Sequence, residues 1–287
     1  MSGEILYLIH TATLVLIYIM VSLSYAIPVG YAGMLNLGHV GLLAIGAYTA
    51  AILANAGYPF LIALFAAAVF TGIVGFLLAF PSRKIKGDYY VLVTLGFAFV
   101  VNALLLNWLS FTKGPFGIVV DRPAGLVNPL SFLLLTVAVT ALVASFVYRM
   151  LHSPFGRALE AVRDDDLVAE SLGKPTGKLR IVSSIVSAVL VGVAGAFLAY
   201  FIQFINPNIF WLDNLVWIVS AIVVGGLASF RGAIAGMVIM FLIFEPLRFL
   251  PLSADLVGAL RLIIFSALLL AIVMFRPKGL FGRAQLE

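Results

Sequence analysis

No aspartate, glutamate, lysine or arginine occurs anywhere in residues 5–82. One membrane span takes roughly 20 apolar residues, so this stretch has room for three spans and their connections. A soluble domain carries about 25% charged residues, whereas only 10% of this chain is charged and 63% is hydrophobic. The sequence therefore predicts an all-α polytopic membrane protein.

Further apolar segments raise the prediction to nine spans, within a range of eight to ten. We expect a single transmembrane domain over residues 1–287, with a tail at 276–287. The first span has no basic segment before it, so we expect it to be retained and not cleaved as a signal peptide. Pro28 is expected to end it. The expected spans are residues 5–27, 30–48, 58–81, 89–110, 130–148, 181–204, 215–230, 232–250 and 256–275.

The second expected span is unusually rich in glycine and contains two polar residues, Asn36 and His39. Two interpretations fit this pattern. Glycines permit close helix packing, and they also suit a helix that is interrupted inside the membrane. Only the interrupted helix would place polar groups along a permeation path. The glycines concerned are Gly30, Gly33, Gly38, Gly41 and Gly46.

Residues 151–180 form the longest charged segment. Ser153 and Pro154 have the character of an N-cap and a first-turn proline, and Gly173 and Pro175 are stop signals. We therefore expect an amphipathic helix over residues 154–172, too polar to span a bilayer. From Arg149 onward the segment carries six basic and five acidic residues. Because this balance suits an anionic membrane surface poorly, a protein partner is favoured over lipid or a merely solvated loop.

Basic residues predict the orientation. With the charged segment inside, 13 lysines and arginines fall on the inner side and four fall outside or near the outer ends. The C-terminus is then cytoplasmic, and nine spans place the N-terminus outside. The formal net charge of +5 therefore reflects topology, and no nucleic-acid partner is expected.

The sequence lacks the residue patterns that catalysis, metal binding or ATP binding would require. There are no cysteines, the three histidines lie far apart, and no G-x-x-x-x-G-K-[ST] pattern is present. We expect no catalytic residues, no metal and no cofactor, and any ATP hydrolysis must come from another chain. Glu245, Arg248 and Arg261 near the outer ends of the last spans are expected to be structural anchors, with Glu245 and Arg248 able to pair.

The chain resembles the permease subunits of branched-chain amino acid ABC importers, specifically the LivM-type half. The resemblance runs through nearly the whole chain in the expected order. It rests on GYAGMLNLGHVGLLAIGAY from Gly30, GDYYVLVTLGF from Gly87, NWLSFTKGPFGI from Asn107, SPFGRALEAVRDDDLVAESLG from Ser153, VVGGLASFRGAIAG from Val223 and MFRPKGLFG from Met274.

This resemblance implies a type II ABC importer permease-like helical bundle in a bacterial or archaeal plasma (inner) membrane. It implies a second, LivH-type permease subunit, two cytoplasmic ATP-binding subunits and an extracytoplasmic substrate-binding protein as partners. It also identifies the charged segment as the part that couples to the ATPase. The coupling residues expected are Pro154, Gly156, Arg157, Ala161, Arg163, Asp164, Asp165, Asp166, Glu170 and Gly173.

The expected translocation path comprises Asn36, Gly38, His39, Thr94 and Phe99. Relatives often carry glutamate where this chain has Phe99, and asparagine where it has Phe116. These two departures bear on the substrate. Because the spans offer polar groups and backbone dipoles but no central charge, we expect branched-chain or related hydrophobic amino acids as the first substrate class, with urea or short amides second. A stand-alone ion-coupled secondary transporter or channel is the alternative outside this class, although no aspartate, glutamate or lysine lies near the middle of any span.

Overall fold

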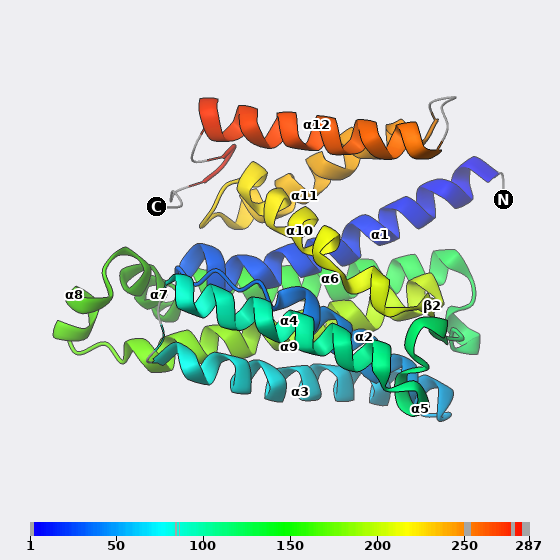
Figure 1. Cartoon of the computed structure of the whole chain (residues 1–287), viewed down its shortest axis with the longest axis horizontal. Helices are drawn as coiled ribbons and strands as arrows, with labels where there is room; N and C mark the ends of the chain where they lie inside the picture. The colour runs from blue at the N-terminus through cyan, green and yellow to red at the C-terminus, as the bar shows by residue number, and fades with distance from the viewer. Residues whose placement is uncertain (1–2, 84, 86, 250–253, 277–278, 283–287) are drawn as a thin grey trace.

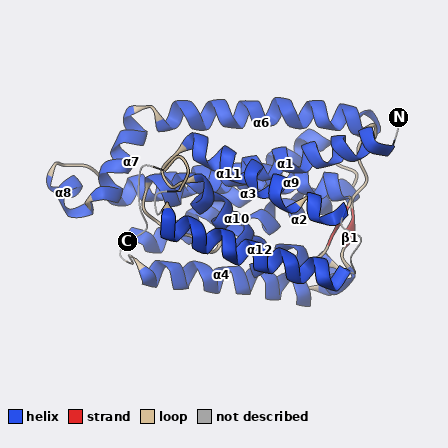
Figure 2. Ribbon diagram, turned by 90° about the horizontal axis from the view of Figure 1, so that it is seen from above, coloured by secondary structure: helices blue, strands red, loops and turns tan. Residues whose placement is uncertain are grey.

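The structure is a computed structural model that describes residues 3–83, 85, 87–249, 254–276 and 279–282. Its helices run mostly along one long axis (Figure 1). The beginning of helix α1 lies at one end of the bundle, and two short helices, α7 and α8, project from the other end. Viewed from above, α6 and α4 form opposite edges with the remaining long helices between them (Figure 2).

Within the described residues, six helices are long and apolar enough to cross a membrane, and three further apolar helices are shorter. This agrees with the prediction of about nine spans. Three of the six are single helices: α4 (Asp88–Asn107), α6 (Pro129–Leu151) and α9 (Thr176–Ile202). The other three run over Gly3–Tyr31, which contains α1 (Gly3–Ala26), over Phe60–Arg83, which contains α3 (Phe60–Ala79), and over Pro207–Gly225, which contains α10 (Leu212–Gly225). The shorter three are α2 (His39–Asn55), α11 (Phe230–Phe244) and residues 263–272 of α12 (Ala254–Phe275).

The first helix does not stop at Pro28 as expected. It continues through a π-helical turn, η1 (Ile27–Tyr31), which contains the proline. Residues 32–38 are then non-helical, and α2 begins at His39. Proline has no amide hydrogen to donate within a helix. In a π-turn the backbone hydrogen bonds run from residue i to residue i+5, so the local pattern changes around the missing donor. The glycine-rich segment is therefore interrupted at residues 32–38, between α1 and α2. That this interruption lines a permeation path stays a prediction.

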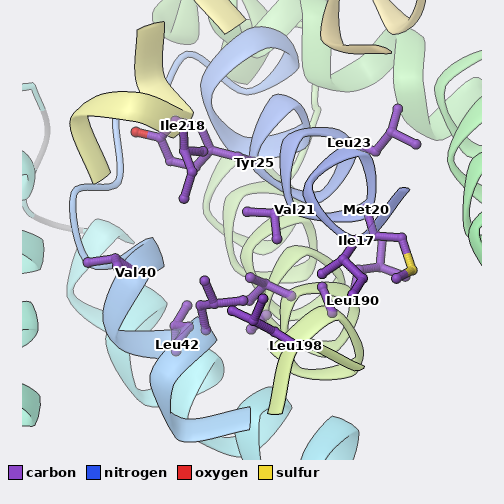
Figure 3. Close-up of a cluster of buried hydrophobic side chains, with 14 of the residues drawn as sticks. Ile17, Met20, Val21, Leu23, Tyr25, Val40, Leu42, Leu190, Leu198 and Ile218 are labelled. Carbon is purple, nitrogen blue, oxygen red and sulfur yellow. The ribbon is translucent and has the colours of Figure 1, made fainter. Parts of the chain in front are cut away.

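Helix α9 is the centre of the bundle and packs on α1, α2 and α3. Small residues bring these helices together: a Cβ added at Gly46 of α2 would lie 2.5 Å from the carbonyl oxygen of Gly192 in α9. Such close backbone approach is the usual way for helices to associate in lipid, where burial of apolar surface drives little. Figure 3 shows the core beside it, where Tyr25 of α1 lies next to Ile218 of α10.

The end of the bundle opposite α7 and α8 is closed by a small antiparallel sheet. Strands β1 (Ile118–Val119) and β2 (Phe204–Ile205) pair with Ile118 opposite Ile205. Arg122 donates hydrogen bonds from Nε to the Tyr200 carbonyl and from Nη2 to the Phe201 carbonyl, at 2.9 and 2.8 Å. The remaining short elements are η2 (Phe80–Arg83), α5 (Leu109–Thr112), η3 (Gly114–Phe116), η4 (Ala124–Leu126), η5 (Pro207–Phe210) and η6 (Pro246–Phe249).

The charged segment does not form the single helix expected over residues 154–172. It forms α7 (Pro154–Asp164) and α8 (Asp166–Ser171), and the long span α9 already begins at Thr176. The break lies at Asp165, whose backbone is extended and whose side chain accepts hydrogen bonds from the amides of Leu167 and Val168. A carboxylate that caps a new helix competes with continuation of the old one.

The expected anchors are described only in part. Glu245 accepts a 2.6 Å hydrogen bond from the hydroxyl of Tyr7, which ties the end of α11 to α1. The side chains of Arg248 and Arg261 lie outside the described residues, as does part of the expected tail at 276–287.

Candidate functional site

Helix α7 lies across the end of the bundle and is anchored on one face. Ser153 caps it, accepting a hydrogen bond from the amide of Phe155, as its sequence predicts. Gly156, Leu159 and Val162 are buried. Gly156 presses against the backbone of Leu151 at the end of α6, where a Cβ would collide. The position of α7 is therefore fixed relative to α6, while its opposite face stays open.

Helix α8 exposes most of its apolar side chains. Only Ala169 is buried in it. Leu167, Val168 and Leu172 are 75%, 53% and 73% exposed. Since α8 projects beyond the spans (Figure 1), this apolar patch and the acidic residues around it are open to a partner protein. Of the expected coupling residues, Pro154, Arg157, Ala161, Asp164, Asp165, Glu170 and Gly173 are exposed, Arg163 and Asp166 are half-buried, and Gly156 is buried.

A backbone turn and an ion pair fix the two ends of α8. Gly173 follows its last turn with a φ of 75°, in keeping with the stop signal in the sequence. Asp166 at its start forms an ion pair with Arg180 of α9, with an Nη2–Oδ2 distance of 3.3 Å. Both side chains are largely buried, at 14% and 11% exposure. The segment is thus tied to the first turns of a span and is not a free loop.

Arg163 connects α7 to the interrupted helix. Its Nε and Nη2 donate to Oδ1 of Asp164 at 2.9 and 2.7 Å, and its Nη1 donates to the Gly30 carbonyl at 3.0 Å. Gly33, with a φ of 65°, lies against the Arg163 side chain, because a Cβ there would be 2.9 Å from Cγ. The expected coupling region therefore contacts the π-turn η1 and the start of the non-helical segment directly.

The non-helical residues 32–38 are held by polar side chains. Asn36 accepts a hydrogen bond from the amide of Gly38 at 2.9 Å, and Thr94 of α4 accepts one from the amide of Leu37 at 3.0 Å. Asn36 is only 2% exposed. These bonds replace the backbone pairing that the interrupted helix lacks, which a membrane environment requires.

His39, at the start of α2, is fully enclosed. Its Nε2 lies 3.0 Å from the hydroxyl of Ser24, and Ser187 of α9 donates to the Ser24 carbonyl at 2.7 Å. The ring also packs against Tyr25, with centroids 4.8 Å apart. Among the described residues, neither Nδ1 of His39 nor the hydroxyl of Tyr25 has a hydrogen-bond partner.

The structure brings together Asn36, Gly38, His39 and Thr94 but not Phe99. Thr94 lies on the buried face of α4, whereas Phe99 is 40% exposed and packs on Trp211. Five residues of helix rotate the side chain well away from that of Thr94. Phe116, the other unusual phenylalanine, is 80% exposed at the end of η3, two residues before β1. Neither phenylalanine joins the polar junction.

Sequence reasoning missed Ser24, Tyr25 and Ser187, which complete the junction around His39. Ser24 lies four residues before Pro28, and a hydroxyl at that spacing is a usable signal because it can reorganise backbone bonding near a proline in a span. Nothing in the sequence points to the contact between Arg163 and Gly30, which lie far apart in the chain. The described residues contain no group of three or more histidine, aspartate or glutamate side chains that could hold a metal ion.

A bundle of about nine apolar helices, with an interrupted helix inside and charged helices projecting at one end, defines a multi-pass membrane protein. The chain belongs to the family described as branched-chain amino acid transport system / permease component, which it matches over residues 7–273. It is accordingly a permease component and not an enzyme.

Relatives of both permease types are similar to the chain. The high-affinity branched-chain amino acid transport system permease protein LivM of Escherichia coli K12 is 32% identical, covering 95% of this chain and 69% of the relative. The corresponding LivH protein of the same organism is 26% identical over 100% of this chain and 99% of the relative. A BraD permease protein of Pseudomonas aeruginosa is 25% identical over 94% and 93%. No solved structure matches the chain.

Proposed function

We propose that this chain is one transmembrane half of an ATP-driven importer for branched-chain or related hydrophobic amino acids. It pairs with a LivH-type permease, and the pair sits on two cytoplasmic ATP-binding subunits. An extracytoplasmic binding protein delivers the substrate. The membrane is the plasma (inner) membrane of a bacterium or archaeon, with the C-terminus of the chain cytoplasmic. The family and the names of the LivM and LivH relatives support the substrate class and the pairing.

The surface of α8 is the observation that best supports coupling of this chain to ATP-binding subunits. Leu167, Val168 and Leu172 are exposed together at the end of the bundle beyond the spans. Asp164, Asp165 and Glu170 surround them and are exposed too. An apolar centre with a charged rim is the composition of a protein interface, and lipid would not accept the carboxylates. A groove with apolar walls and basic edges on a cytoplasmic subunit fits this surface.

Basic residues at the same end support the orientation. Arg83 lies beside Gly177 at the start of α9, and Arg149 occupies the last turn of α6, both at the end that carries α7. Clustered arginine at one side of a membrane protein marks the cytoplasmic side. The beginning of α1 lies at the opposite end (Figure 1), as nine spans require.

The interruption between α1 and α2 supports the proposed translocation path for the substrate. Asn36 and His39 lie at the break between α1 and α2, where backbone and side-chain dipoles are available without a fixed charge. A zwitterion crossing such a route meets polar groups but no ion that would hold it tightly. Selection by the separate binding protein is consistent with a weakly selective path.

Capture of the ATP-binding subunits tests the proposal. The full complex is expressed with Leu167, Val168 and Leu172 changed to serine, and the permease is purified with whatever remains bound. We expect the ATP-binding subunits to be lost while the LivH-type subunit is retained. The matched control changes three lipid-facing residues of similar exposure, Leu61, Phe65 and Leu77, to smaller apolar residues. Retention of the ATP-binding subunits by the α8 variant would contradict the docking role.

A further inference from the structure

Arg163 connects the projecting helices to the interior of the bundle. It is the last basic residue of α7, and its side chain is 17% exposed. Its partner on the far side is the carbonyl of Gly30, in the π-turn η1 and 133 positions earlier in the chain. A carbonyl near the end of a helix lacks its usual intrahelical donor. The Arg163 guanidinium supplies that donor from another element.

The guanidinium is held in both directions. Nη1 reaches Gly30, while Nε and Nη2 both donate to one carboxylate oxygen of Asp164. Asp164 itself is 66% exposed on the open side of α7. Charge-assisted bonds of this kind are short and directional, because the planar fork fixes their geometry. A partner that displaces or turns α7 at Asp164 must therefore move the Arg163 fork as well.

The turn that receives Arg163 is packed against a second turn of the fold, between α10 and α11. Gly30 lies against the backbone of Ala228, in the turn between α10 and α11, where a Cβ on Gly30 would be 2.8 Å from the Ala228 nitrogen. The same region is tied to the residues after α12, since the amides of Leu280 and Phe281 donate to the carbonyls of Val224 and Gly225. A shift of Gly30 cannot be absorbed locally, because backbone meets backbone.

We propose that Arg163 is a positioning residue that transmits movement of α7 to the π-turn η1, and through it to the junction at Asn36 and His39. The inference rests on the proposed function, because it takes the movement of α7 from a docked ATP-binding subunit. It adds a place where the force enters the bundle: the break between α1 and α2, in addition to the ion pair of Asp166 and Arg180 at the beginning of the long span α9. Loss of Arg163 then uncouples hydrolysis from uptake without undocking the ATP-binding subunits.

The test uses the complete complex in vesicles with three variants. Arg163→Ala removes the fork. Arg163→Lys keeps the charge but cannot bond Gly30 and Asp164 together in the same planar geometry. Arg231→Ala is the matched control, because Arg231 is an exposed arginine at the start of α11, at the same end of the bundle. Three quantities are measured for each: ATP-binding subunits retained on purification, the rate of ATP hydrolysis, and substrate taken up per ATP hydrolysed.

We expect Arg163→Ala to keep its ATP-binding subunits and to hydrolyse ATP within about twofold of the unaltered complex. Uptake per ATP should fall about tenfold or more, the effect of losing one charge-assisted hydrogen bond. Uptake per ATP in Arg163→Lys should lie between the values for Arg163→Ala and the unaltered complex. Arg231→Ala should match the unaltered complex. Unchanged uptake per ATP in Arg163→Ala overturns the inference. Loss of the ATP-binding subunits in that variant also overturns it, because Arg163 would then be a docking residue.

A second readout follows the junction itself. A single cysteine is placed at Leu35, which is half-buried in the non-helical segment of this cysteine-free chain. In the unaltered background its reaction with a water-soluble thiol reagent should change when ATP is added, and Arg163→Ala should abolish that change. A persistent change in the variant overturns the transmission role. Failure of the unaltered permease to bind any ATP-binding subunit would instead overturn the proposed function, so the two failures are distinct.

Discussion

Nε2 of His39, at the start of α2, lies 3.0 Å from the hydroxyl of Ser24, in the last turns of α1. The two residues stand on either side of the interruption, so this contact joins its two halves inside the core. Ser187 of α9 donates to the Ser24 carbonyl and extends the connection to the central helix. The interruption is thus a built junction with its own polar contacts.

Ser24→Ala should destabilise the chain, because it leaves a buried imidazole nitrogen without a partner. Such a loss costs about 1–3 kcal/mol. The midpoint of thermal unfolding in detergent measures it, with Ser110→Ala as the control since Ser110 is exposed. Equal midpoints for the two variants would show that the Ser24 contact contributes nothing.

Gly30→Ala should also destabilise and impair transport. A Cβ at Gly30 would lie 2.8 Å from the Ala228 nitrogen and 3.1 Å from its Cα, so backbone must move. Overpacking of this kind costs about 1–3 kcal/mol. Gly96→Ala in α4 is the matched control, because no atom lies within 4 Å of its added Cβ. That control should gain up to about 1 kcal/mol from helix propensity. Improved stability in Gly30→Ala would contradict the close contact.

How much of this fold the sequence predicts depends on the kind of signal. Apolar length predicts the spans, because a bilayer fixes the number of residues needed to cross it. Capping chemistry predicts Ser153 and Gly173 correctly, since both act within one turn of their own helix. The break at Asp165 is missed because any of the three consecutive aspartates could cap a new helix. Spacing alone therefore favours a single helix over residues 154–172.

The candidate site is predicted less completely. Glycine density indicates the interruption, but it does not say which polar residues of other helices complete it. Thr94 lies at the junction, whereas Phe99 does not, because the family pattern marks a position without giving the rotation of α4. The exposure of Val168 and Leu172 does not follow from helical periodicity, because periodicity shows which residues share a face of a helix and not what covers that face.

Asp166→Ala should lower the stability of the fold by more than the loss of a surface ion pair would. Removing it leaves Arg180, 11% exposed, without that carboxylate partner in a largely buried setting. Breaking a buried pair costs about 3 kcal/mol. A double-mutant cycle with Arg180→Met, followed by thermal unfolding, separates the pair from its parts. Strict additivity of the two single changes would indicate no interaction between them.

A cysteine scan over residues 35–43 tests the path. If the junction faces the translocation route, Leu35 and Leu37 should react with a water-soluble thiol reagent, because both are half-buried in the non-helical segment. Val40, Leu42 and Leu43 should stay protected in the core. Addition of ATP to the full complex should change the reactivity at Asn36 or His39. Uniform protection of all nine positions, with and without ATP, would mean that the glycines serve packing alone.

The most direct measurement is uptake of radiolabelled substrate into vesicles that contain the permease pair, the ATP-binding subunits and the cognate binding protein. The account predicts saturable uptake of leucine, isoleucine or valine that requires ATP and the binding protein, with urea not transported. ATP-dependent uptake of urea without any of the three amino acids would contradict the substrate class. Uptake driven by a sodium or proton gradient through this chain alone would contradict the ATP-coupled permease itself.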